Sequence, residues 1–100
     1  MDRNTQRLVA RTAAKEALRD LYPCFVGVGS LEFRRKLITR VRDRLHEACR
    51  MFENAEPDEL DEEFYLPLFD ALSFITVGTG IKPIRKKPIE NARAALELLV

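Results

Sequence analysis

The clearest pattern along the chain lies between residues 31 and 54, where apolar side chains recur at alternating steps of three and four. This spacing places them along one stripe of an α-helix, so we predict a helix over this segment. The apolar stripe, called the apolar seam below, consists of Ile38, Val41, Leu45, Ala48 and Phe52. The opposite face carries Lys36, Arg40, Asp43, Glu47 and Arg50. The regularity of the apolar seam is also typical of helices that pair with a second copy.

Three more helices are predicted from weaker patterns. Residues 5–22 carry alanine and leucine at helical spacing, and we expect Pro23 to end this helix because proline has no backbone N–H to donate. The acidic residues that follow Pro57 suit a helix N-terminus, and a broad apolar face continues over residues 60–75. A last helix is expected to start at Pro88, which is a favourable first-turn residue.

Pro67 must kink or divide the third of these segments. On a straight helix Leu66 and Phe74 would lie away from the main apolar face, beside Asp70, so that helix is either buried nearly all round or has a second apolar surface. No segment reads as a strand. We therefore predict an all-α fold: a small bundle of four helices, or five if Pro67 divides the third, in a single domain over residues 1–100.

The four glycines stand in two short pieces, at positions 27, 29, 78 and 80. Glycine-rich loops can hold phosphate, but neither piece has the spacing of a nucleotide-binding loop, and Glu32 occupies the place where a dinucleotide fingerprint needs a third glycine. We interpret both pieces as helix ends, with Ser30 as the N-cap of the helix that follows the first.

Charge is strongly segregated although the net charge is only +1. Residues 1–50 carry 12 Lys or Arg and 6 Asp or Glu, whereas residues 51–70 carry 8 acids and no Lys or Arg. Residues 71–100 carry 5 basic and 2 acidic residues. Such a chain either folds its acidic segment against its own basic ones or presents separate charged surfaces to partners.

The basic residues of the first helix recur every four positions and trace a spiral around it: Arg3, Arg7, Arg11, Lys15 and Arg19. Arg35 and Lys36 add charge at the start of the second helix. A nucleic-acid-binding surface has this appearance, but aromatic residues that would stack on bases are not interleaved with the cations. The sequence favours internal pairing of the spiral with the acidic segment, residues 51–70, because the overall charges nearly balance. In that segment Glu59, Glu62 and Glu63 cluster at the start of the predicted helix, and Asp58 and Asp61 join them.

Catalytic chemistry has little support in the sequence. His46 is the sole histidine, and Arg42 and Arg50 flank it one turn away on either side. Cys24 and Cys49 fit free, partly buried thiols rather than a metal site, and the acidic segment lacks the ligand spacing of a calcium loop. We expect no enzyme activity, cofactor or metal. The absence of a signal-like or membrane-spanning apolar run favours a cytoplasmic protein.

These observations favour a non-enzymatic helical protein, an adaptor, inhibitor or regulatory subunit, that acts by binding another protein. The alternative is a nucleic-acid-binding protein that uses the basic face of the first two helices. A homodimer is also expected, through the apolar seam and with Leu66 and Phe74 as extra contacts. The candidate partner-binding residues are Arg7, Arg11, Lys15, Arg19, Arg35, Lys36, Glu59, Glu62, Glu63, Leu66 and Phe74.

Overall fold

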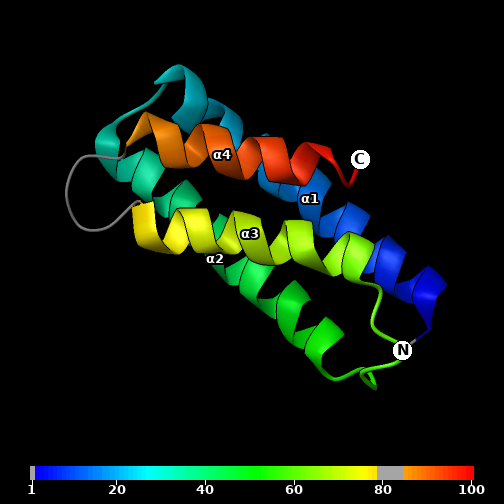
Figure 1. Cartoon of the computed structure of the whole chain (residues 1–100). Coiled ribbons are helices and arrows are strands. Elements are labelled where there is room, and N and C mark those ends of the chain that lie inside the picture. The colour runs from blue at the N-terminus through cyan, green and yellow to red at the C-terminus, as the bar shows by residue number, and fades with distance from the viewer. Residues whose placement is uncertain (1, 79–84) are drawn as a thin grey trace.

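The computed structural model describes residues 2–78 and 85–100, which form four α-helices and no strand (Figure 1). The helices are α1 (Arg3–Val26), α2 (Leu31–Glu53), α3 (Glu62–Gly78) and α4 (Lys86–Glu97). Successive helices run in opposite directions, and each packs against two neighbours, with α1 and α3 on the diagonal. The predicted all-α four-helix bundle is confirmed. Among these four helices, none has the length and apolar character needed to cross a membrane.

The apolar seam of α2 is the centre of this bundle. All five of its side chains are buried, and Val41, Leu45 and Phe52 have no exposed surface. Alanines of α1 cover part of it, and their short side chains allow the two helix backbones to approach closely. The apolar seam is buried within the chain itself and therefore cannot also pair with a second copy. The prediction that it forms a dimer interface is wrong.

The first helix is longer than predicted, because α1 continues through Pro23 to Val26. The fixed φ of proline, about −65°, fits a helix, and the loss is a single hydrogen bond. Cys24 is buried and Phe25 packs against the core, so the residues after the proline gain by remaining helical. At the other end, Asp2 caps the helix by accepting a hydrogen bond from the Thr5 N–H at 2.7 Å.

The first glycine pair behaves as predicted. Gly27 adopts a left-handed conformation, with a φ of 77°, and its N–H donates to the carbonyl of Pro23, which ends α1. Ser30 then caps α2, since its hydroxyl accepts a hydrogen bond from the Phe33 N–H at 3.1 Å. Gly78 is the last residue of α3, and Gly80 lies outside the described residues.

The predictions for three prolines are confirmed only in part. Pro57 does not open a helix: residues 54–61 form an irregular connector, and α3 begins at Glu62. Pro67 lies inside α3 without dividing it, because the buried side chains of Leu68 and Ala71 follow it and offset a cost of about 3 kcal/mol. Pro88 lies in the first turn of α4, which starts two residues earlier than expected.

Buried charge joins α1 to α2. The carboxylate of Asp20 is buried and accepts a hydrogen bond from Nη1 of Arg44 at 3.0 Å, with Nη2 of Arg40 at 3.7 Å. Nε of the same Arg44 lies 2.8 Å from Glu16. A buried carboxylate without such partners would be strongly destabilising, so these residues fix how the two helices face each other.

Truncation of the core tests this architecture. Leu45 lies at the middle of the apolar seam and has no exposed surface. Leu45→Ala should lower the free energy of unfolding by about 2–5 kcal/mol, because it removes buried apolar surface and leaves a cavity. Chemical denaturation followed by circular dichroism measures the change, and a loss of less than about 1 kcal/mol would contradict this packing.

The two thiols predict a pH dependence. Cys24 and Cys49 are free and buried, and burial raises the pKa of both, that of Cys49 to about 11. The ordinary thiol value is 9.0, so between these values the unfolded chain releases a proton that the folded chain keeps. The free energy of unfolding should therefore fall as the pH rises through this window.

Denaturation at about pH 8 and about pH 10 measures this fall, and Cys49→Ala should show a smaller one than the wild-type protein. Equal losses in the two proteins would show that Cys49 does not contribute. Cys24, which is present in both, serves as the internal reference.

Candidate protein-binding surface

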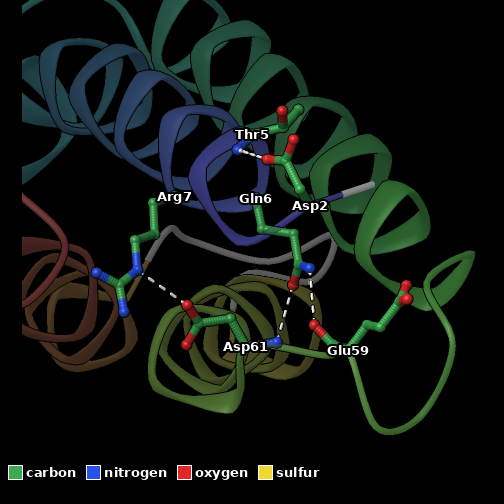
Figure 2. Close-up of polar contacts among 6 residues, drawn as sticks. All are labelled: Asp2, Thr5, Gln6, Arg7, Glu59 and Asp61. Atoms are coloured by element: carbon green, nitrogen blue, oxygen red, sulfur yellow. Dashed lines mark hydrogen bonds and ion pairs between the residues drawn. The ribbon is translucent and has the colours of Figure 1, made fainter.

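The connector between α2 and α3 is fastened to the first turns of α1 (Figure 2). The side chain of Gln6 is fully buried, and its Nε2 donates to the carbonyl of Glu59 at 2.9 Å while its Oε1 accepts from the N–H of Asp61 at 2.8 Å. The buried carboxylate of Asp61 accepts from Nε of Arg7 at 3.0 Å. Together these bonds fix the place where α3 starts.

Two cations of the α1 spiral lie against α3 as well. The guanidinium carbons of Arg7 and Arg11 lie 5.0 and 5.3 Å from the ring centroid of Phe64, within the range of cation–π attraction. Of the pairing predicted between the spiral and the acidic segment, only the Arg7–Asp61 ion pair is present within residues 2–78 and 85–100. Asp61 belongs to the acidic segment predicted to pair with the spiral, whereas Glu59, Glu62 and Glu63, on which that prediction centred, form no ion pair with it in the described part of the chain.

The rest of the predicted basic residues lie on two helices, α1 and α2. Lys15 and Arg19 are exposed on α1, well away from the acidic connector. Arg35 and Lys36 are exposed on α2, where Nζ of Lys36 lies 3.8 Å from Glu32 one turn earlier. The structure therefore divides the basic residues between two helices and an internal contact with α3.

The predicted acidic residues are all exposed. Glu62 and Glu63 lie in the first turn of α3, where the helix dipole favours negative charge, and Glu59 lies in the connector. Within the described part of the chain, none of these three side chains forms an ion pair. Their charges are thus available to a partner.

Large apolar side chains continue this exposed surface along α3. Leu66 is 49% exposed and Phe69 is 47% exposed, and Phe74 is exposed further along. The surface, called the α3 face below, consists of Glu62, Glu63, Leu66, Phe69, Asp70 and Phe74. The sequence pattern identified Leu66 and Phe74 but not Phe69. Its position three residues after Leu66 places both on one side of a helix, and this spacing was the signal that could have found it.

A stack of three aromatic rings connects the α3 face to the core of the bundle. The rings of buried Phe52 and Tyr65 lie 5.8 Å apart, and those of Tyr65 and exposed Phe69 lie 5.9 Å apart. The hydroxyl of Tyr65 donates a hydrogen bond to the carboxylate of Glu53 at 2.8 Å. The pKa of Tyr65 is raised to about 12, mainly because the hydroxyl is partly buried and also because of this hydrogen bond. The stack fixes Phe69 relative to the core, which favours a preformed binding surface.

Comparison with known proteins adds no family to this description: no protein-family model, curated protein or solved structure matches the chain. Function must therefore be inferred from the geometry of the surface.

The connector contacts predict a specific pattern of stability. Gln6→Ala should lower the free energy of unfolding by about 1–3 kcal/mol, because it leaves the Glu59 carbonyl and the Asp61 N–H without their buried partner. Glu59→Gln is the matched control, since Glu59 takes part through its backbone alone and its side chain is exposed. Denaturant midpoints that fall equally in both variants would contradict the role given to Gln6.

Proposed function

We propose that this protein is a non-enzymatic protein-binding module and that its α3 face binds a basic amphipathic helix of another protein. The observation that carries the proposal is the exposure of Leu66 and Phe69 on a surface that also presents Glu62 and Glu63, which form no ion pair with the described residues. An adaptor, an inhibitor and a regulatory subunit would all act through such a surface.

The apolar part of the α3 face supports a protein partner. Leu66 and Phe69 lie three residues apart on one helix, so a partner can cover both at once. Aromatic anchors of this kind provide much of the binding energy in protein interfaces, and contiguous exposed apolar surface is uncommon on proteins that have no partner. A helix that lies along α3 would bury both side chains in one groove-like contact.

The charge of the α3 face supports a basic partner. Residues 51–70 contain 8 acids and no Lys or Arg, and the helix dipole accounts for only the acids in the first turn of α3. Acids such as Glu62 and Glu63 repel one another until a cation approaches. Lysine or arginine on the partner would relieve that repulsion, speed association and exclude acidic competitors.

The nucleic-acid alternative has less support. A phosphate backbone would be repelled by the α3 face, so it would have to bind the basic residues of α1 and α2. Arg7 is paired with Asp61 and shares the ring of Phe64 with Arg11, and this interrupts the basic track of α1 between Arg3 and Lys15.

The proposal is tested with a synthetic amphipathic peptide that presents leucine on one face and lysine on the other. We expect it to bind the wild-type protein in a salt-sensitive manner. Leu66→Ala with Phe69→Ala should weaken binding by about tenfold or more, because both apolar anchors are lost. Fluorescence anisotropy of the labelled peptide measures the affinity.

Two controls make the test specific. Leu98→Ala removes an apolar side chain that is exposed beyond the end of α4, and it should leave peptide binding unchanged. A peptide with the same leucine face but glutamate in place of lysine should not bind. Equal affinity of the peptide for the wild-type protein and for the Leu66 and Phe69 double variant would overturn the proposal.

A further inference from the structure

A second surface, on α2, carries a row of charges that is complementary to the same row on a second copy of the chain. Lys36, Arg40, Asp43 and Glu47 follow one another at steps of four, three and four, which places them within about 60° of the helix circumference. Their side chains are between 59% and 75% exposed. This row, called the α2 strip below, is basic in its first half and acidic in its second.

The ion pairs that these four residues make within the chain are long. Lys36 lies 3.8 Å from Glu32, Asp43 lies 3.7 Å from Arg42, and Glu47 lies 3.9 Å from Arg50. Arg40 lies 3.7 Å from Asp20, whose closer partner is Arg44. Exposed pairs at these distances hold side chains weakly, so all four charges can turn to a partner.

Two copies of the α2 strip complement each other when they run antiparallel. In the register that places Lys36 opposite Glu47 of the other copy, Arg40 also lies opposite Asp43 of the other copy, and the two-fold axis repeats both pairs. A parallel arrangement would instead place like charges together. The pattern thus selects one orientation, the isologous contact of a two-fold dimer.

An apolar groove borders the α2 strip along α1. It has a volume of about 690 Å³, and three of the four strip residues, Arg40, Asp43 and Glu47, line one side of it. The apolar side chains that line it are Leu8, Val9, Ala13, Ala48 and Met51. Leu8 and Met51 are exposed in the isolated chain, so a second copy that docks on the α2 strip would cover apolar surface in addition to pairing charges.

We infer that the chain forms a two-fold dimer in which the α2 strips of two copies pack antiparallel beside the groove between α1 and α2. This surface is separate from the α3 face, so dimerisation leaves the proposed partner site open on both copies. The dimer is salt-sensitive, because charge complementarity sets its orientation.

Charge reversal tests the register directly. Lys36→Glu places two glutamates opposite each other, and Glu47→Lys places two lysines opposite each other, so each variant alone should weaken dimerisation by about tenfold or more. An equimolar mixture of the two variants should dimerise again, because the glutamate introduced at position 36 of one chain then meets the lysine introduced at position 47 of the other. Sedimentation velocity at low salt distinguishes monomer from dimer in all three samples.

The double variant K36E/E47K is the second test, since it exchanges the two charges within one chain and should dimerise as the wild-type protein does. Circular dichroism serves as the control for folding, and both exposed positions should tolerate the changes. A wild-type protein that stays monomeric at high concentration and low salt would overturn the inference and leave the groove to a different partner. Failure of the mixture to recover dimerisation would also overturn it.

Discussion

A carboxylate can be buried only beside partners that satisfy it, and this requirement at Asp20 and Asp61 organises the molecule. Asp20 of α1 is bound by Arg44 of α2, and Asp61 at the start of α3 is bound by Arg7 of α1. Each pair fixes the position of one helix against α1. Arg7 and Arg44, the closest partners of these two carboxylates, are thus held in ion pairs within the chain, and other exposed charges are left to act at the surface.

The two proposed binding surfaces carry charges other than those of Arg7 and Arg44. Within the described residues, Glu62 and Glu63 in the first turn of α3 form no ion pair, and the aromatic stack through Tyr65 presents Phe69 beside them. On α2, the exposed charges of the α2 strip form a row whose basic half complements the acidic half of a second copy. One surface suits a basic partner and the other suits a second copy, so the same segregation of charge supports both proposals.

The strongest periodicity in the sequence predicted the fold well. The apolar seam required the burial that the structure shows, and Ser30 and Gly27 had local capping chemistry that any environment would preserve. The prolines were harder, because whether a helix continues past Pro23 or Pro67 depends on what the following residues bury, and that is a tertiary property. Of the polar contacts, charge balance predicted only that the α1 spiral would pair with the acidic segment, as Arg7 does with Asp61. Gln6 and Asp61 are 55 positions apart, and nothing local distinguishes Gln6 from an exposed glutamine. A buried polar network depends on the meeting of distant segments, whereas an exposed pair such as Leu66 and Phe69 can be recognised from helical spacing alone.

On this account the acids of the α3 region serve a partner rather than the fold. Changing Glu59, Glu62 and Glu63 together to Gln, with denaturant midpoints measured at low and high salt, tests it most directly. The midpoint at low salt should change little, because the relieved repulsion offsets the lost helix-dipole interaction of Glu62 and Glu63 and no ion pair within the described residues is lost. Asp61→Asn, which neutralises the buried acid, should lower the denaturant midpoint at low salt. A midpoint that falls in the triple variant at low salt and recovers at high salt would contradict the account.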